Sequence, residues 1–394
     1  MSDPDSTDHL PPPARPLRVL YVSETGLLGG AGNSLLRLLE SLDAAQVEAD
    51  IAAPEGELIA AADELGIPGY PLPECRLRRA FDPLLLWRQL RRFLTFCRSL
   101  NAVCDLLRPD LVHANGPVAA WAAVRCSGVP VIWHVRDLRL PRRLMRLVRR
   151  KAAAVVAISS AVAEWVAAET PHGAPIHVIH NGLTARDTAA TRSRYSLRRE
   201  WRIPADAPLI GCMAQMVPWK RQEVLLRAMS EILAAVPNAH LVFIGDDAFG
   251  ENREYAAELR RLVGDIGLQQ AVTWVEHTVE PSSALAALDV LAHPADKEPF
   301  GRVVLEALAV GTPVVAVNQA GPAEILEEGK SGLLVPPLDP SALAKAILRV
   351  LEDPELAESL RQEGLRRAED FSQETLTPVM VRLYRDIMSR PGGR

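Results

Sequence analysis

The sequence predicts an α/β protein with two doubly wound parallel sheets. The chain has 394 residues, a length at which two domains of ordinary size are expected. Short apolar runs alternate with longer segments that carry apolar residues at helical spacing, and this alternation continues through both halves of the chain. The short runs are almost continuously apolar, as in strands that are buried on both faces of a parallel sheet. We therefore expect two similar α/β halves joined by a linker.

The first half begins with a strand at residues 17–23, a glycine-rich turn and a helix at residues 33–42. The glycines of this turn are Gly26, Gly29, Gly30 and Gly32. A strand, a glycine-rich turn and a helix in succession bring backbone amides close to a phosphate, although a plain tight turn has the same pattern. Further strands are expected at residues 47–53, 110–114, 130–135, 153–158 and 176–180, with helices between them.

Polar side chains follow three of these strands. They are His113 with Asn115-Gly116, His134 with Arg136-Asp137, and the pair His180-Asn181. Because ligands of doubly wound sheets lie beyond the carboxyl ends of the strands, these residues are candidates for ligand contacts. A histidine at a strand end can also be a structural residue with its hydrogen bonds satisfied inside the protein. Gly182 follows Asn181, and this dipeptide indicates a turn first and a ligand contact second.

Two segments of the first half are strongly basic. Residues 136–151 contain eight Arg or Lys against one Asp, and residues 76–100 contain seven Arg against one Asp. In the first segment the apolar residues recur at helical spacing; they are Leu140, Leu144, Leu147 and Val148. The arginines lie largely on other sides of the expected helix; they are Arg139, Arg142, Arg143, Arg146, Arg149 and Arg150. An apolar stripe beside a cationic face suits an anionic membrane surface. A helix that packs on its own sheet and keeps its basic face in water has the same pattern, so both interpretations stay open.

The second half follows a polar connection at residues 184–208. A strand at residues 208–215 ends at a turn that contains Lys220 and Arg221. A lysine at the carboxyl end of a strand can neutralise a leaving diphosphate without a metal ion. The remaining strands are expected at residues 240–245, 272–275, 313–317 and 332–335, again with helices between them, and the apolar segment 285–292 is expected to be a helix end followed by a short strand.

Two carboxylates bracket an apparent turn into a helix between the last strands. Glu298 and Glu306 are eight positions apart, with Pro299, Phe300 and Gly301 between them. At about 100° per residue, one helix would leave the two carboxylates on different sides. We therefore expect Glu298 in the loop and Glu306 in the first or second turn of the helix. Amides near the helix start would bind a phosphate, while the carboxylates would accept hydrogen bonds from hydroxyls, which suits a ligand carrying phosphate and polyol together.

The segment EPFGRVVLEALAVGTPVVA, residues 298–316, resembles the donor-sugar motif of the retaining glycosyltransferases of family 4, which have the GT-B fold. The resemblance extends from about Leu17 to Phe371. It implies two Rossmann-like domains that face each other across a cleft. The implied organisation is a flexible tail (1–16), an acceptor-side domain (17–190), a nucleotide-sugar donor domain (191–374) and a C-terminal helix that returns to the first domain (375–394).

The same resemblance implies a role for individual residues. His134 and Glu298 would bind the donor sugar, Glu306 the ribose hydroxyls, and Lys220 the departing diphosphate. The family has an arginine where this chain has Gln215, so Lys220 would carry more of the charge, helped by Arg221 or Arg302. The full set of expected donor contacts is Gly30, Gly32, Asn181, Gln215, Lys220, Arg221, Phe300, Gly301, Arg302, Val303 and Glu306, with His134, Lys220 and Glu298 at the reacting centre.

Composition limits the other partners. A net charge of −5 argues against nucleic acid as a general partner. The five cysteines have no C-x-x-C spacing and are expected to be reduced thiols of a cytoplasmic protein, which would contact the inner face of the membrane only peripherally. The only Asp-x-Asp, Asp3-Pro4-Asp5, lies in the expected tail, and no His/Cys cluster has zinc spacing. We therefore expect no metal and no cofactor, with the nucleotide sugar as substrate and a carbohydrate, lipid-linked or small-molecule acceptor.

Two other kinds of function remain open from the sequence. An epimerase or a phosphorylase acting on nucleotide sugars would share the paired-sheet frame and differ in its products. A non-catalytic protein that binds nucleotide sugars is the alternative from another class, and Gln215 is the residue that motivates it.

Overall fold

The computed structural model describes residues 15–75, 82–138, 140–247, 250, 252–276 and 280–390. The chain divides into two compact units. The N-terminal unit comprises Met1–Val156, Val166–His177 and Thr377–Arg394, and the C-terminal unit comprises Ala157–Trp165 and Val178–Leu376. The end of the chain thus packs with its beginning, and residues 178–190 pack with the C-terminal unit. No helix of the described residues is both long enough and apolar enough to cross a membrane.

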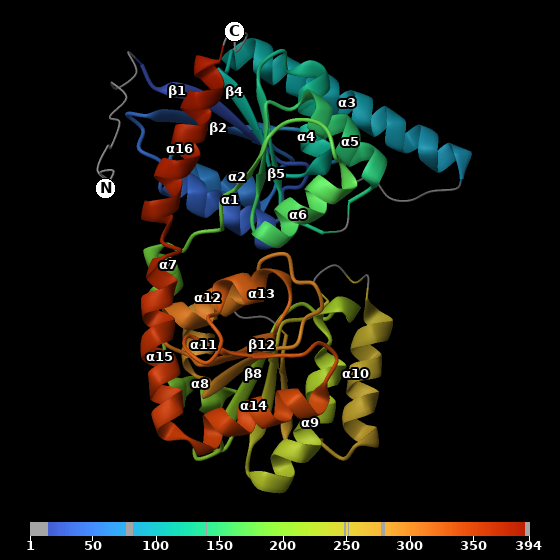
Figure 1. Cartoon of the computed structure of the whole chain (residues 1–394). Helices are drawn as coiled ribbons and strands as arrows, with labels where there is room; N and C mark the ends of the chain where they lie inside the picture. The colour runs from blue at the N-terminus through green and yellow to red at the C-terminus, as the bar shows by residue number, and fades with distance from the viewer. Residues whose placement is uncertain are drawn as a thin grey trace, which may run out of the picture. The chain divides into compact units, whose positions relative to one another are not determined.

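The N-terminal unit is built on a seven-stranded sheet with the order β3-β2-β1-β4-β5-β6-β7 (Figure 1). Its strands are β1 Leu17–Val22, β2 Val47–Ala53, β3 Gly69–Pro71, β4 Leu111–Ala114, β5 Val131–Val135, β6 Ala154–Ala157 and β7 Ile176–Val178. The strands from β3 to β5 pair in parallel. The helices are α1 Gly30–Glu40, α2 Glu57–Glu64, α3 Pro83–Leu107, α4 Pro117–Cys126 and α5 Arg142–Lys151, together with the end of α6 Ser160–Glu169 and most of α16 Gln373–Ser389.

The C-terminal unit repeats this plan with a six-stranded sheet of order β10-β9-β8-β11-β12-β13, paired in parallel throughout. Its strands are β8 Leu209–Met213, β9 His240–Ile244, β10 Val272–Val275, β11 Val290–His293, β12 Val314–Val317 and β13 Leu333–Val335. Its helices are α7 Ala185–Thr188, α8 Arg194–Glu200, η1 Pro218–Lys220, α9 Gln222–Ala235, α10 Arg253–Asp265, α11 Pro281–Ala286, α12 Arg302–Ala309, α13 Ala320–Ile325, α14 Pro340–Glu352 and α15 Pro354–Glu369.

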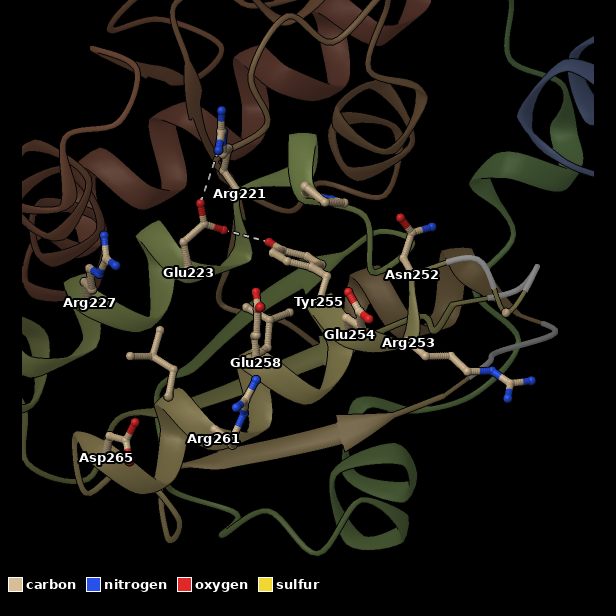
Figure 2. A pocket seen from close by; sticks show the side chains of 14 residues that line it. Arg221, Glu223, Arg227, Asn252, Arg253, Glu254, Tyr255, Glu258, Arg261 and Asp265 are labelled. Carbon is tan, nitrogen blue, oxygen red and sulfur yellow. Dashed lines mark hydrogen bonds and ion pairs between the residues drawn. The ribbon is translucent and has the colours of Figure 1, made fainter. Parts of the chain in front are cut away.

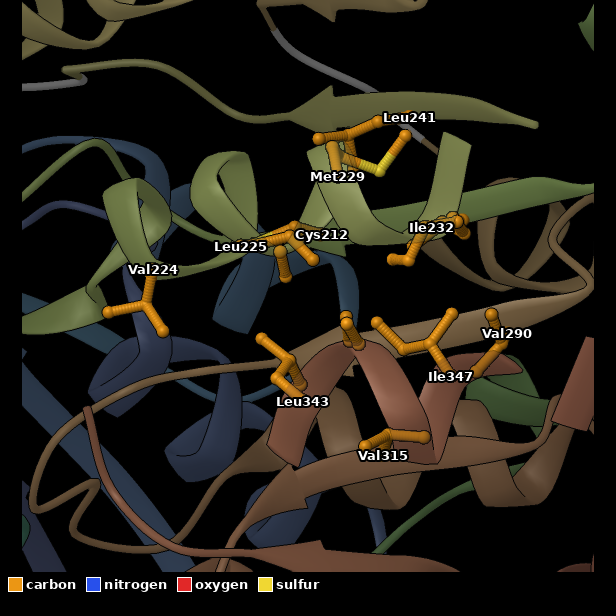
Figure 3. Close-up of a cluster of buried hydrophobic side chains, with 14 of the residues drawn as sticks. Cys212, Val224, Leu225, Met229, Ile232, Leu241, Val290, Val315, Leu343 and Ile347 are labelled. Carbon is orange, nitrogen blue, oxygen red and sulfur yellow. The ribbon is translucent and has the colours of Figure 1, made fainter. Parts of the chain in front are cut away.

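The core of the C-terminal unit lies between its sheet and the helices α9 and α14. Leu225, Met229 and Ile232 of α9 are buried with Leu343 and Ile347 of α14 (Figure 3). These residues recur every three or four positions, which places each set on one side of its helix. The packing fixes the sheet whose loops carry the candidate site.

The predicted fold class is confirmed: both units are α/β with doubly wound parallel sheets, and β2 and β10 have the predicted bounds. Strand β3 was not predicted because its three residues, Gly-Tyr-Pro, carry no apolar run. The predicted glycine turn was wrong in its extent. Helix α1 begins at Gly30, so Gly30 and Gly32 lie in its first turn.

The structure changes the prediction for the N-terminal end and for the basic helix. Residues 1–14 of the expected tail lie outside the described residues, but Arg15 already donates hydrogen bonds to both carboxylate oxygens of Asp110. In α5, Met145 and Val148 are buried, whereas Leu147 is 52% exposed. The prediction that Arg149 lies apart from the packed side is wrong, because its buried guanidinium donates to the carbonyl oxygens of Thr170 and Ala174. The α5 stripe is therefore mostly a packing face; Arg139 lies outside the described residues.

Candidate functional site

The candidate site lies where the strand order of the C-terminal sheet reverses. From β8 the chain adds β9 and β10 on one side, and then β11, β12 and β13 on the other, so β8 and β11 are neighbours. The loops that follow these two strands open at the same edge of the sheet, and this is where doubly wound sheets bind their ligands. The first loop carries Lys220 and the second carries Glu298.

The two loops meet through an ion pair. Lys220 Nζ donates to a carboxylate oxygen of Glu298, and both side chains are largely buried. Lys220 Nζ also lies 4.2 Å from the centroid of the Trp219 ring, a cation–π contact. The backbone N–H of Asp296 donates to Trp219 O at 2.8 Å, which joins the loops a second time. The structure thus brings together two site residues that are 78 positions apart.

The charge state of Glu298 follows from its neighbours. Burial by itself would raise the pKa of Glu298, but the charge of Lys220 and the contact with His293 outweigh it and lower this pKa to about 2. His293 ends β11, and its Nε2 lies 3.4 Å from a Glu298 oxygen. Burial, and then the charge of Lys220, lowers the pKa of His293, while Glu298 acts in the opposite direction. Glu298 is therefore an anion at neutral pH and can only accept hydrogen bonds.

Helix α12 begins directly after this loop, as the glutamate spacing predicts. Glu298 lies in the loop, and Glu306 lies in the second turn of the helix, where it accepts a hydrogen bond from Arg302. Gly301 precedes the helix with a φ of 92°, a left-handed conformation that favours glycine. The first turn of any α-helix leaves N–H groups without an intrahelical acceptor, so residues 301–303 present a suitable environment for an anion.

The remaining predicted cation of the turn is Arg221. Its guanidinium lies 3.6 Å from carboxylate oxygens of both Glu223 and Asp296, and its Nε is buried without a hydrogen-bond partner among the described residues. Gln215, which stands where the resembled family has an arginine, has an exposed side chain, and its carbonyl oxygen accepts from Gln222 Nε2 at 2.9 Å. Lys220 and Arg221 are thus the two cations on this loop.

Phe300 and Asn181, two of the predicted donor contacts, are buried and pack against other parts of the protein. The Phe300 ring is buried, with its centroid 5.8 Å from that of His180 and 6.1 Å from that of Phe371. Asn181 is buried after β7, and Gly182 allows close approach of Gln373, since a Cβ at Gly182 would lie 2.1 Å from Gln373 Oε1. Val303 is half-buried in the first turn of α12.

In the N-terminal unit, His134 lies in a buried chain of hydrogen bonds. His134 Nδ1 is 2.9 Å from His113 Nε2, and His113 Nδ1 is 2.7 Å from the Tyr384 hydroxyl. The Tyr384 hydroxyl is 3.1 Å from that of Tyr21. The four side chains come from β5, β4, α16 and β1. Burial lowers the pKa of His113 to about 3 and that of His134 well below its ordinary value, with Arg136 acting in the same direction on both, so both imidazoles are neutral at pH 7.

Arg136 sets the direction of every hydrogen bond in this chain. Its Nη2 lies 3.3 Å from His134 Nδ1, and a guanidinium can only donate, so Nδ1 is an acceptor. His113 Nε2 must then carry the proton that it shares with His134, and His113 Nδ1 accepts from Tyr384. In neutral His134 the proton therefore sits on Nε2. That atom is buried and has no hydrogen-bond partner among the described residues. It is the donor that remains unused at the end of this chain.

The switch point of the N-terminal sheet, between β1 and β4, carries the other predicted glycines. A Cβ at Gly30 would meet nothing within 4 Å, whereas one at Gly32 would lie 2.8 Å from Leu27 O. Glu24 follows β1, and its carboxylate accepts from the Ala119 N–H in the first turn of α4 at 3.0 Å. Burial raises the pKa of Glu24 to about 7, although backbone hydrogen bonds oppose this change.

A pocket of about 1000 Å³ opens elsewhere in the C-terminal unit, between η1, α9 and α10 (Figure 2). Tyr255 donates to Glu223 at its wall, and Arg221 is the predicted site residue that lines it. Its size alone does not make it the ligand site, because Lys220, Glu298 and Glu306 are not part of its lining.

Sequence reasoning missed several residues of these clusters. Arg136 was predicted at the end of its strand but was given no role. His293 was given none either, although a polar residue at a strand's carboxyl end was the available signal. Tyr384 had no such signal, because it is 271 positions from His113. The described residues contain no group of three or more His, Cys, Asp or Glu that could hold a metal ion.

Two family models match the chain. Residues 28–186 match "Glycosyltransferase Family 4", and residues 193–367 match "Glycosyl transferases group 1". Lys220, Glu298 and Glu306 fall in the second match, and His134 falls in the first.

Individual proteins give the same picture. The lipopolysaccharide core biosynthesis glycosyltransferase LpsE of Rhizobium meliloti is 30% identical over 278 residues, which cover 70% of this chain and 76% of that protein. A D-inositol 3-phosphate glycosyltransferase of Corynebacterium urealyticum is 34% identical over 203 residues, so the match spans only about half of that relative (48%) and 51% of this chain. The crystal structure of Anabaena HepE in complex with UDP-glucose is similar in fold, with a TM-score of 0.80 at 23% identity over 94% of this chain and 100% of HepE.

Proposed function

The chain belongs to glycosyltransferase family 4, and from this premise we propose that it moves a sugar from a nucleotide-sugar donor to an acceptor hydroxyl, with retention at the anomeric carbon and without a metal ion. The membership makes it an enzyme of the hexosyltransferase type. The proposal for the acceptor is a glycan precursor, including a lipid-linked one, because the relative from Rhizobium meliloti is described as acting in lipopolysaccharide core biosynthesis.

One observation carries the proposal: Lys220 and Glu298 form an ion pair at the switch point of the C-terminal sheet. The departing group is a nucleoside diphosphate, whose negative charge grows as the glycosidic bond breaks. An ammonium group has three donors, so Lys220 can contact Glu298 and a phosphate oxygen together. With the amides at the start of α12, it would stabilise the leaving group.

The carboxylates would recognise the sugar and the ribose. Glu298 is an anion held in place by Lys220 and is therefore a fixed acceptor for sugar hydroxyls. A carboxyl group with a pKa of about 2 is a poor proton carrier at neutral pH, which argues against a general acid or base role for it. Glu306, oriented by Arg302, is the proposed contact for the ribose hydroxyls.

The acceptor hydroxyl loses its proton during transfer, and some group must accept that proton. In the proposed step the acceptor oxygen bonds to the anomeric carbon while the bond to the diphosphate oxygen breaks, and the acceptor proton passes to that departing oxygen. All bonds and protons of this step are accounted for without a base from the protein. His134 contributes its unused Nε2–H, which we assign as a donor to an oxygen of the donor sugar, in keeping with the role that the resemblance gives it.

The test is transfer activity in Lys220→Ala and Glu298→Gln. A screen of nucleotide sugars by thermal shift first identifies the donor as the one that raises the melting temperature. We expect Lys220→Ala to lose about a hundredfold or more in kcat, the effect of removing one group that stabilises a developing charge. Glu298→Gln should also lose activity, because it removes the charged acceptor for the sugar hydroxyls and the partner that holds Lys220. The matched controls are Lys330→Ala and Glu327→Gln, which break an exposed ion pair of the same unit. Full activity in both site variants would refute the assignment.

Product analysis separates this function from its alternatives. A transferase gives a glycoside of the acceptor with the donor's anomeric configuration, and chelators leave its rate unchanged. An epimerase would convert the donor with no acceptor present, and a phosphorylase would require inorganic phosphate. Tight donor binding without any product would favour a non-catalytic protein, the reading that Gln215 motivates.

A further inference from the structure

The N-terminal half of α3 has a face that the N-terminal unit does not cover. The helix packs through Phe93, Phe96 and Leu100, and the Phe93 ring stacks on Trp121 with centroids 4.1 Å apart. The beginning of α3 extends past the other helices of its unit (Figure 1). A cluster of apolar side chains there would indicate a contact with something outside this unit.

The uncovered face is apolar. Leu86, Leu90 and Leu94 are spaced by four positions and so lie on one side of the helix. They are 50%, 54% and 43% exposed, and Trp87 beside them is 53% exposed. Single exposed apolar residues are ordinary on a protein surface, but four neighbours in less than three turns form a patch.

The same stretch of the helix, residues 84–98, is cationic. Arg88, Arg91, Arg92 and Arg98 are exposed, and no carboxylate occurs between residues 83 and 104. The guanidinium of Arg91 lies over the Trp87 ring at 4.7 Å, so the aromatic and the cation form one surface. Leucine and tryptophan next to arginine are the side chains that enter the boundary between lipid headgroups and acyl chains.

We propose that this surface, residues 84–98 of α3, docks on an anionic phospholipid bilayer. The leucines and Trp87 enter the acyl boundary, and the arginines contact the phosphates. A second copy of the chain fits the surface less well, because an antiparallel or parallel pairing of two α3 helices would bring eight arginines together without a counter-charge. The helix α5 does not offer the same surface, since its apolar residues are mostly packed and its Arg149 is buried.

The experiment is co-sedimentation of the full chain with vesicles, without any nucleotide sugar, so its outcome is independent of the proposed transfer reaction. We expect binding to phosphatidylcholine vesicles that contain phosphatidylglycerol and little binding to phosphatidylcholine alone. Raising the salt concentration should release the protein, because the electrostatic part is screened within about 10 Å at 0.1 M salt.

Matched variants locate the surface. Leu90→Ser combined with Trp87→Ser should weaken vesicle binding at least tenfold, whereas Leu147→Ser, at a similarly exposed position of α5, should leave it unchanged. Arg91→Gln and Arg92→Gln together should weaken it by about fivefold for each arginine lost. Thermal melts check that each variant is folded.

Three outcomes would overturn the proposal. They are equal binding to neutral and anionic vesicles, equal loss in the α3 and α5 variants, and self-association of the chain that the Trp87 and Leu90 substitutions abolish. The last would assign the surface to a second copy.

Discussion

Replacing Lys220 by methionine removes the cation beside Glu298 but keeps an unbranched side chain of similar length. In the wild type, burial raises the pKa of Glu298 and Lys220 more than offsets it, so that this pKa falls from 4.5 to about 2. That difference corresponds to about 3 kcal/mol of net stabilisation of the folded state at neutral pH. Removing one partner of a buried ion pair costs about 3–5 kcal/mol, which agrees with this magnitude.

The substitution should also reverse the pH dependence. In the wild type the contribution of Glu298 is fully present above pH 4.5 and is lost as the pH falls toward about 2, because the unfolded chain takes up the proton first. In Lys220→Met, burial dominates and raises the pKa of Glu298 above its ordinary value. The folded state then holds the proton longer than the unfolded chain, so stability declines as the pH rises above about 4.5.

Calorimetry across this pH range is the assay, since it can separate the transitions of two compact units. The variant Lys220→Met/Glu298→Gln should recover much of the loss, because it leaves no unpaired buried charge. Lys330→Met is the control at an exposed pair and should change little. If Lys220→Met loses less than about 1 kcal/mol at neutral pH, or keeps the wild-type pH dependence, the ion pair does not set the charge of Glu298.

Three further predictions concern other buried groups. Because burial raises the pKa of Glu24 from 4.5 to about 7, the stability of the N-terminal unit should fall by up to about 3 kcal/mol as the pH rises through this interval, and thermal melts of Glu24→Gln should lack this fall. Tyr384→Phe should cost about 1–3 kcal/mol in denaturant unfolding, since it leaves His113 Nδ1 without its donor. Gly321→Ala should cost about 1–3 kcal/mol, because a Cβ there would lie 2.1 Å from Phe300 O, whereas Gly30→Ala, with open space at this position, should not destabilise the protein in the same assay.

Sequence patterns predicted those features that depend on neighbours in the chain. Short, mainly apolar runs located β2 and β10 to the residue, although β2 contains Glu48 and Asp50 and β10 is only partly buried at the edge of its sheet. The position of Glu298 in a loop and of Glu306 inside α12 followed from the angular spacing of a helix. Both inferences depend only on residues that are close together in the sequence.

Features that depend on tertiary packing were not accessible in this way. The pairing of Lys220 with Glu298 requires β8 and β11 to be neighbours, and the sequence order of the strands does not state this. Arg149 looked like one more arginine of a solvated face, yet it is buried where two backbone carbonyls accept its hydrogen bonds. The sequence pattern of residues 76–100 indicated only a basic segment, and the exposure of Trp87 and the leucines of α3 emerged from the structure.

The two ion pairs of the C-terminal site link recognition of the sugar to recognition of the diphosphate. In the free protein Lys220 neutralises Glu298, and Arg302 neutralises Glu306. A bound diphosphate would compete with Glu298 for the ammonium group of Lys220. It would also bring its own negative charge close to Glu298, which is unfavourable for a buried carboxylate. Hydroxyls of a donor sugar can supply the missing hydrogen bonds to Glu298, and a diphosphate alone cannot. The ion pair therefore holds the loops in place before binding and favours a ligand that carries both a diphosphate and a sugar, which is the property that the proposed reaction requires of its donor site.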